Sequence, residues 1–239
     1  MKPKDRIILA LDVPDYDEAL NIIKRFREEV EIFKVGSELF TSAGPKIVDK
    51  INSLGKKVFL DLKFHDIPTT VSRAALAASA LGVFMLNIHT MGGHEMMKST
   101  VDAIVRSTLR KNTVRPRILG VTLLTSIDKD TLSNDLGIQH SLRIQVKHLA
   151  KLAYNAGIDG VVASPQETEM IRTHFGKGFL IVTPGIRPLW YGPDDQKRTL
   201  TPKQAIRKGA DYIVIGRAVM SQSDPVKALK RIHNEIETA

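Results

Sequence analysis

Short apolar runs alternate with amphipathic stretches along the whole chain. In a typical run, the five residues from Ile7 to Leu11 are apolar and Asp12 ends them. Apolar runs of this length, without helical spacing, are typical of strands that are buried on both faces. We therefore predict eight strands, which cover residues 6–12, 32–36, 57–63, 83–89, 118–123, 160–163, 179–182 and 212–216.

A stretch with helical spacing follows each of these runs. The first, residues 15–27, repeats apolar residues every three or four positions after an Asp-rich start that is typical of a helix cap. Most of the stretches end at a glycine, which takes up the left-handed conformation of a helix end without a steric penalty. The predicted helices cover residues 15–27, 44–54, 69–81, 94–109, 141–156, 166–175, 202–208 and 225–238.

Eight strand–helix units without a break in composition predict an α/β fold, a single (β/α)₈ TIM barrel over residues 1–239. A doubly wound open sheet is the alternative, but such sheets seldom use eight regular units. In a barrel, the chemistry lies where the strands end and the following loops begin. The residues at these strand ends are therefore the first candidates for a functional site.

The predicted strand at residues 57–63 carries an unusual cluster of charge. Side chains at i and i+2 share one face of a strand, so Phe59, Asp61 and Lys63 point the same way, and Asp66 follows on the next turn. Removing charges from water is costly unless they pair, so packing alone rarely places such a cluster there. A structural ion pair at a strand end is the alternative. The place of the cluster on the predicted barrel rim favours a functional site.

Other polar residues fall at the same rim. Lys34 lies late in the second predicted strand, and those that end or follow a predicted strand are Asp12, Thr122, Thr125, Gly216 and Arg217. Asn87 and His89, at the end of the fourth strand, are either ligand contacts at the rim or polar residues that are satisfied within the fold.

The loops after the last two strands are candidates for phosphate binding, because barrels commonly bind phosphate there. Gly216 permits close backbone approach, and Arg217 can donate charge-assisted hydrogen bonds. Residues 187–200 form a long polar connection, which we interpret as a lid with Arg187 and Gln196 reaching the phosphate. The alternative is a surface loop that does not contact a ligand.

Composition narrows the function classes. The chain has no Cys, which excludes disulfide scaffolds, thiolate metal sites and cysteine nucleophiles. Its first residues lack the apolar core of a signal peptide, and no apolar run approaches the roughly 18 residues of a membrane span. We therefore expect a soluble cytoplasmic protein without a membrane partner.

The net charge of +9 admits an acidic partner. Nucleic-acid binding usually combines clustered basic residues with aromatic ones, whereas aromatic residues make up only 5% of this chain and its basic residues have acidic neighbours. A small phosphorylated or carboxylated ligand is the better expectation, and we expect no nucleic-acid partner.

With these residues assembled, the chain resembles the orotidine 5′-phosphate decarboxylases of the bacterial type almost from end to end. The most specific match is Asp61-Leu62-Lys63-Phe64-His65-Asp66-Ile67-Pro68-Thr69-Thr70. Shorter matches, in the same order as in the family, are at residues 9–12, 33–36, 121–126, 183–187 and 215–217. No functional position departs from the family pattern.

The resemblance implies loss of CO₂ from orotidine 5′-phosphate to give UMP, without a metal or organic cofactor, in a homodimer with shared active sites. It implies that Lys63 protonates C6 of the pyrimidine and that Asp61 lies beside the departing carboxylate. Asp66 and Thr70 are expected to come from the partner subunit. Lys34 and Asp12 hold the ribose hydroxyls, and Lys34 also takes part in catalysis. The remaining implied contacts are Thr125 to the pyrimidine, and Arg187, Gln196, Gly216 and Arg217 to the phosphate.

The residues themselves are compatible with this chemistry. Decarboxylation leaves a carbanion that no cofactor delocalises, so a fixed cation at the reacting carbon is the obvious device. Lys63 can be that cation and then donate its proton, and Asp61 and Asp66 would keep it charged.

Two alternatives remain. One is a Mg²⁺-dependent sugar-phosphate decarboxylase or aldolase that uses Asp61 and Asp66 as ligands. The other is a basic barrel that binds RNA or a nucleotide without chemistry.

Overall fold

The computed structural model describes residues 1–191 and 199–239. Eight parallel strands form a closed barrel in chain order, in which β1 pairs with both β2 and β8. The strands are β1 (Ile7–Leu11), β2 (Ile32–Gly36), β3 (Lys57–Phe64), β4 (Met85–His89), β5 (Arg117–Val121), β6 (Gly160–Val162), β7 (Leu180–Thr183) and β8 (Tyr212–Ile215). The predicted barrel is confirmed, and the open sheet is excluded because β8 closes onto β1.

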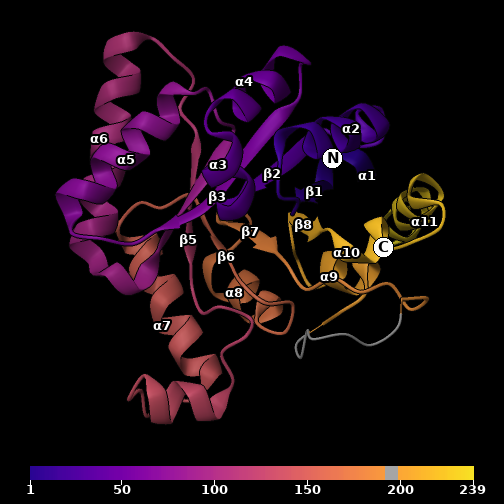
Figure 1. Ribbon diagram of the computed structural model, residues 1–239. Coiled ribbons are helices and arrows are strands. Elements are labelled where there is room, and N and C mark those ends of the chain that lie inside the picture. Colours follow the sequence, from indigo (N-terminus) through magenta and orange to yellow (C-terminus); the bar gives the residue numbers. More distant parts are fainter. Residues whose placement is uncertain (192–198) are drawn as a thin grey trace.

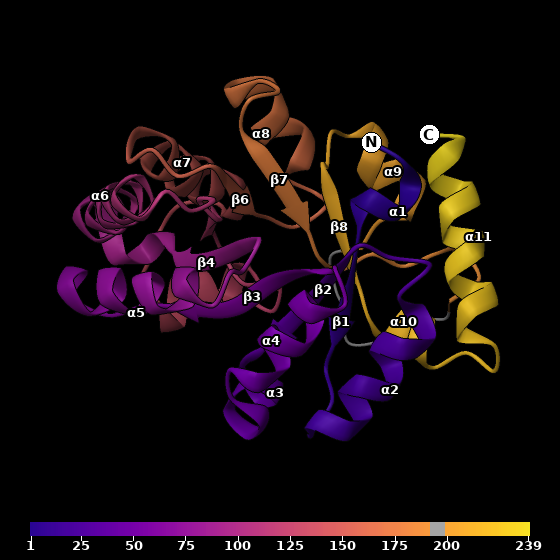
Figure 2. The ribbon, with the colours of Figure 1, turned by 90° about the horizontal axis from the view of Figure 1, so that it is seen from above.

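The helices lie outside the strands and enclose them (Figures 1 and 2). Those that follow the strands are α2 (Tyr16–Phe26), α4 (Lys46–Ser53), α5 (Pro68–Ala80), α6 (Gly93–Lys111), α7 (Leu142–Asn155), α8 (Thr168–Phe175), α9 (Pro202–Arg207) and α11 (Pro225–Glu237). The predicted helix ends agree with these within two residues. Helical periodicity therefore located the outer layer well.

The predicted start of the 44–54 helix at Gly44 is wrong. Gly44 has a φ of 64° and ends α3 (Ser37–Ala43), and Pro45 then precedes α4. The left-handed glycine separates two short helices where the sequence pattern indicated one. The structure also adds short elements that the pattern did not predict, which are α1 (Pro3–Arg6), η1 (Thr90–Gly92), η2 (Thr131–Asp135) and α10 (Arg217–Met220).

Apolar side chains pack in two layers. Inside the barrel, Ile8, Phe59 and Met85 belong to a small buried cluster, whereas their chain neighbours Leu9 and Leu60 face the surrounding helices. Because the side chains of a strand alternate between its two faces, both faces of the barrel are covered. The interior cluster fills the barrel below the mouth, so the polar residues at the strand ends lie above an apolar floor.

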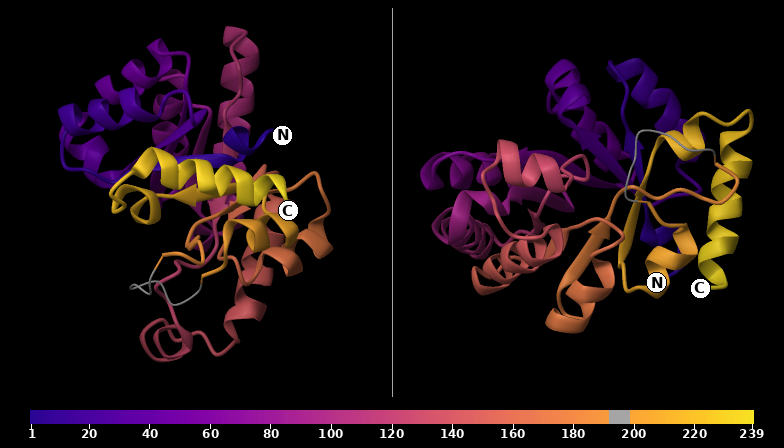
Figure 3. Two further views of the ribbon diagram at one scale, coloured as in Figure 1. Left: turned by 90° about the vertical axis from the view of Figure 1, so that its right-hand side faces the viewer. Right: turned by 90° about the horizontal axis from the view of Figure 1, so that it is seen from below.

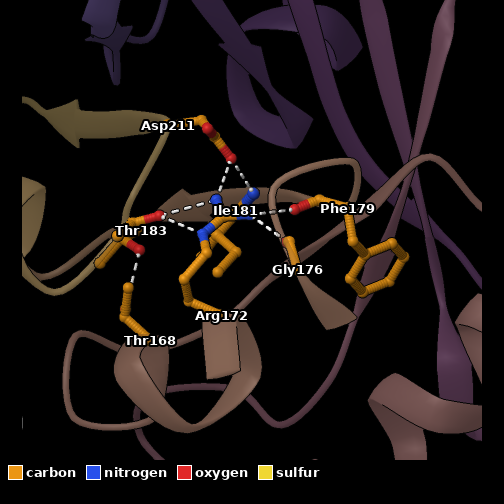
Figure 4. A network of polar contacts seen from close by, with 8 residues as sticks. Thr168, Arg172, Gly176, Phe179, Ile181, Thr183 and Asp211 are labelled. Atoms are coloured by element: carbon orange, nitrogen blue, oxygen red, sulfur yellow. Dashed lines mark hydrogen bonds and ion pairs between the residues drawn. The ribbon is translucent and has the colours of Figure 1, made fainter. Parts of the chain in front are cut away.

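An arginine from α8 holds the opposite end of the barrel together (Figure 4). Its guanidinium pairs with Asp211 at 2.6 Å and donates to the carbonyls of Gly209, at 2.7 Å, and Phe179, at 2.9 Å. Asp211 also accepts a hydrogen bond from the backbone of Ile181 at 2.8 Å. Arg172 therefore ties α8 to the chain just before β7 and β8.

The two chain ends lie near each other, beside α1, α9 and α11 (Figures 2 and 3). α1 packs against α11 and β8, which places the first residues at the amino ends of the strands. Among the described residues, each helix is too short or too polar to cross a membrane.

Candidate active site at the carboxyl ends of the strands

A cavity opens at the carboxyl ends of the strands. The described residues that line it come from β1, β2, β3 and β5 to β8 and the loops that follow them. They are Ala10, Asp12, Lys34, Phe59, Asp61, Lys63, Val121, Leu123, Leu124, Thr125, Val162, Ala163, Pro184, Gly185, Arg187, Val214, Gly216 and Arg217. Most of the predicted site residues thus share one cavity at the predicted end of the barrel.

Four charges of alternating sign run along one wall of this cavity. Nζ of Lys34 lies 2.8 Å from Oδ1 of Asp12 and 3.5 Å from Oδ2 of Asp61. Nζ of Lys63 lies 2.8 Å from Oδ1 of Asp61. The strand register brings these side chains together, because Ala10 pairs with Lys34 and Gly36 pairs with Asp61 on adjacent strands.

Lys34 remains charged although it is buried, with only 8% of its surface exposed. Burial by itself lowers the pKa of the Lys34 ammonium, but Asp61 and Asp12 outweigh this effect and raise the pKa above its usual value. Lys34 therefore presents a permanent positive charge and links the carboxylates of β1 and β3.

Lys63 lies where the strand pattern breaks. The prediction that Phe59, Asp61 and Lys63 share one face is confirmed, since all three line the cavity. However, Lys63 has a φ of 52°, and the register between β3 and β4 shifts between Leu60 and Phe64. A left-handed conformation costs a residue other than glycine about 1–2 kcal/mol, so the surrounding contacts must compensate for it.

The structure tests whether Asn87 and His89 contact a ligand at the rim or are satisfied within the fold. Asn87 is completely buried, donates to Asp61 at 2.6 Å and accepts from the backbone N–H of Lys63 at 2.8 Å, so it is satisfied within the fold. The ring of His89 lies 5.2 Å from that of His65. Burial lowers the pKa of His89, and His65 and Lys63 lower it further against the opposite effect of Asp61. Neither Asn87 nor His89 is among the residues that line the cavity.

The loops after β7 and β8 form the other side of the cavity. Arg187 and Arg217 line it, with Gly185 and Gly216 beside them. A Cβ atom at Gly216 would lie 3.2 Å from Cβ of Ala10, so a larger residue would crowd the end of β1. The two cations make this side suited to an anion.

The ends of the predicted lid are held together. The backbone N–H of Arg187 donates to the carbonyl of Leu200 at 2.9 Å, which brings the two ends of the 187–200 connection side by side. The guanidinium of Arg187 lies 5.3 Å from the ring centre of Tyr191. Gln196, the other predicted lid contact, lies outside the described residues.

Two predicted site residues are not brought into the cavity of their own chain. Asp66 and Thr70 are both exposed and are absent from the cavity lining. Oδ1 of Asp66 accepts a hydrogen bond from the N–H of Ile67 at 2.6 Å. Thr122, a candidate at the rim, is not among the residues that line the cavity; its buried hydroxyl donates to the carbonyl of Val162.

Sequence reasoning did not single out the apolar wall of the cavity or the link made by Asn87. Val162 and Val214 line the cavity from the inward face of short strands, and Leu123 and Leu124 line it from the loop after β5. Strand alternation could have indicated the two valines.

Among the described residues, no group of three or more His, Cys, Asp or Glu side chains is arranged to hold a metal ion.

Comparison with known proteins gives one consistent family. The model of the orotidine 5′-phosphate decarboxylase / HUMPS family matches residues 5–232. A protein of Trichlorobacter lovleyi named orotidine 5′-phosphate decarboxylase is 50% identical over 233 residues, which cover 98% of this chain and 95% of that protein. One of the same name from Syntrophomonas wolfei is 47% identical over 238 residues, covering 99% of this chain and all of that protein.

Solved structures agree in fold. The crystal structure of orotidine 5′-phosphate decarboxylase from Lactobacillus acidophilus superposes with a TM-score of 0.85 at 38% identity, over 97% of this chain and 99% of that one. An uncharacterized conserved protein from Geobacillus kaustophilus superposes with a TM-score of 0.83 at 36% identity, over 96% of this chain and 99% of that one.

Proposed function

Since the chain belongs to the orotidine 5′-phosphate decarboxylase / HUMPS family and matches decarboxylases of that name over nearly its whole length, we propose that it converts orotidine 5′-phosphate to UMP and CO₂ through Lys63. The observation that carries this mechanism is the ion pair of Lys63 and Asp61 in a cavity that two arginines line on its other side. The reaction belongs to pyrimidine biosynthesis.

Lys63 serves as both electrostatic stabiliser and acid. When the bond between C6 and the carboxylate breaks, CO₂ leaves and its bonding electron pair stays on C6. The ammonium of Lys63 stabilises this pair as it develops and then donates one proton to C6, which gives UMP. No step in this scheme needs an organic cofactor or a metal ion.

Asp61 keeps the ammonium in place and lies beside the departing carboxylate. Two charges about 4 Å apart interact by roughly 4 kcal/mol at an effective dielectric of 20. Enzymes typically lower barriers by roughly 8–23 kcal/mol, so this pair alone is insufficient. Repulsion between Asp61 and the substrate carboxylate adds ground-state strain in this scheme.

The phosphate supplies the remaining binding energy in our proposal. Arg187, Gly216 and Arg217 bind it, together with Gln196 of the 187–200 lid. Energy from this remote contact offsets the cost of holding the reacting end in a strained, desolvated arrangement. Lys34 and Asp12 hold the ribose hydroxyls between the two ends, and Thr125 contacts the pyrimidine.

We further propose a cytoplasmic homodimer with shared active sites. Asp66 and Thr70 are exposed on their own chain and follow directly after the β3 strand that carries Lys63. Supplied by the partner subunit, Asp66 would complete the charge array around Lys63, and Thr70 would add a hydroxyl beside it.

The structure gives less support to a Mg²⁺-dependent sugar-phosphate enzyme. That reading needs Asp61 and Asp66 to converge on one ion, but Asp61 is paired with two lysines and Asp66 is absent from the cavity lining. The test is an assay of purified protein with EDTA present, in which loss of the ultraviolet absorbance of orotidine 5′-phosphate reports turnover. We expect turnover to UMP. An activity on a sugar phosphate that EDTA abolishes would contradict the proposal.

A further inference from the structure

β3 and β4 do not match residue for residue beside the cavity. Leu60 pairs with Leu86, but the next pair joins Phe64 to Ile88. Three residues of β3, Asp61 to Lys63, therefore face a single residue of β4, Asn87. Such bulges leave backbone groups without their usual ladder partners and redirect side chains.

The side chain of Asn87 takes the place of the missing ladder bond. Its Oδ1 accepts from the backbone N–H of Lys63 at 2.8 Å, and its Nδ2 donates to Oδ1 of Asp61 at 2.6 Å. The orientation of the amide follows from its partners, because an N–H requires an acceptor and a carboxylate requires a donor. One amide thus joins the backbone of Lys63 to the side chain of Asp61.

We propose that Asn87 is a positioning residue for the decarboxylation, holding the Lys63 backbone and the Asp61 carboxylate in the arrangement that proton donation to C6 requires. The inference rests on the proposed function of the cavity. Oδ1 of Asp61 is also the atom that pairs with Nζ of Lys63, at 2.8 Å. Asn87 therefore fixes both ends of the Lys63 side chain, directly at the backbone and through Asp61 at the ammonium.

The chemistry of the amide suits this role better than that of other side chains. Asp would keep the acceptor but lose the donor, and Leu would lose both. Asn87 is completely buried and is not among the residues that line the cavity, so it acts through Lys63 and Asp61 and does not touch the substrate. The left-handed φ of 52° at Lys63 needs such support, because the backbone of a lysine does not hold that conformation unaided.

The test compares kcat, KM and UMP affinity in the full-length protein. Asn87→Ala should lower kcat about a hundredfold, since a small misplacement of reacting groups has effects of that order, while KM and the Kd for UMP change less than about threefold. Asn87→Ser places a hydroxyl that can both donate and accept, and it should recover about tenfold of the lost kcat. Thr100→Val is the matched control, because it removes another buried hydrogen bond, from the Thr100 hydroxyl to the Met96 carbonyl at 2.7 Å. The kcat of this control should equal that of the wild type.

The possible failures are distinguishable. A wild-type protein that does not decarboxylate orotidine 5′-phosphate would contradict the proposed function and remove the premise. An active wild type with an unchanged kcat in Asn87→Ala would overturn the positioning role alone. Equal losses of kcat and UMP affinity, no recovery in Asn87→Ser, or failure of both variants to fold would assign Asn87 to fold stability and also overturn it.

Discussion

Nζ of Lys63 lies 2.8 Å from Oδ1 of Asp61, although Lys63 has left the regular strand conformation that Asp61 still occupies. The pair lies at the end of an apolar strand, above the filled interior of the barrel. The ion pair and the bulge together fix where the ammonium points. The proposed chemistry depends on that direction, since a proton donor must lie within reach of the carbon it protonates.

The phosphate contact should act mainly on substrate binding. Arg217→Ala removes a cation from the cavity lining, and we expect KM for orotidine 5′-phosphate to rise about a hundredfold, or about 2.7 kcal/mol, with a smaller loss of kcat. Orotidine, which lacks the phosphate, should be turned over equally slowly by variant and wild type. The control is Arg207→Ala, an exposed arginine of α9 outside the cavity lining. An unchanged KM in Arg217→Ala would exclude the phosphate role.

The shared active site can be tested by mixing inactive variants. Lys63→Ala and Asp66→Asn should each be inactive alone, but hybrid dimers contain one site with both native residues. Random exchange of subunits makes about half of the dimers hybrid, so activity should return to about a quarter of the wild-type value.

Asp66→Asn suits this experiment because its amide oxygen can still accept the hydrogen bond from Ile67. The control mixture is Lys63→Ala with Asp61→Asn, two residues that pair within one chain, and it should stay inactive. No recovery in the first mixture, despite verified subunit exchange, would count against the composite site.

A half-buried histidine outside the cavity lining should make stability depend on pH. Burial lowers the pKa of His233 in α11 and outweighs the opposite effect of Glu29, whose carboxylate lies 3.9 Å away; Glu237 and Lys230 also face it. Because the unfolded chain binds the proton more readily, the unfolding free energy should fall as pH drops below about 6.5. Above that pH neither state is protonated, and the effect disappears.

The measurement is urea unfolding at pH 7.5 and at pH 5.5, which lie above and below the ordinary histidine pKa of about 6.5. His233→Gln should show a smaller loss of stability between them than the wild type. His140→Gln, at an exposed histidine, should behave like the wild type. An equal pH dependence in all three proteins would remove His233 from the explanation.

The guanidinium network at the far end of the barrel should contribute strongly to stability. Arg172→Met leaves Asp211 without its cation and removes one donor from the carbonyls of Gly176, Phe179 and Gly209, so we expect a loss of about 2–4 kcal/mol in urea unfolding. Lys98→Ala, which removes an exposed pair with Asp102 on α6, should change little. Because the network lies opposite the cavity, the kcat of folded Arg172→Met should be unchanged. A large loss of kcat would contradict the view that this network serves stability alone.

The pattern of the sequence was sufficient for the barrel because strand and helix periods alternate so regularly. It also placed Asp12, Lys34, Asp61 and Lys63 on one rim, since each lies late in a predicted strand or at its end. The bulge at Lys63 was not predictable, because it results from the mismatch between β3 and β4 and leaves no local signal. For the same reason Asn87 could not be assigned, and its role became visible only through its two partners.

The split between α3 and α4 was missed for a different reason. Gly44 was read as the start of a helix, although a glycine followed by proline is as typical of a helix end. The expected place of Asp66 and Thr70 in the site of the partner subunit stays a prediction, and neither residue lines the cavity of its own chain.

The most direct test of the account is the turnover of orotidine 5′-phosphate by Lys63→Ala beside the wild type, with EDTA present and UMP affinity measured in parallel. We expect kcat to fall more than about a thousandfold, or about 4 kcal/mol, with the Kd for UMP nearly unchanged. Lys57→Ala, an exposed lysine at the other end of the same strand, is the control and should keep full activity. Unchanged turnover in Lys63→Ala would contradict the central claim that this ammonium stabilises and protonates C6.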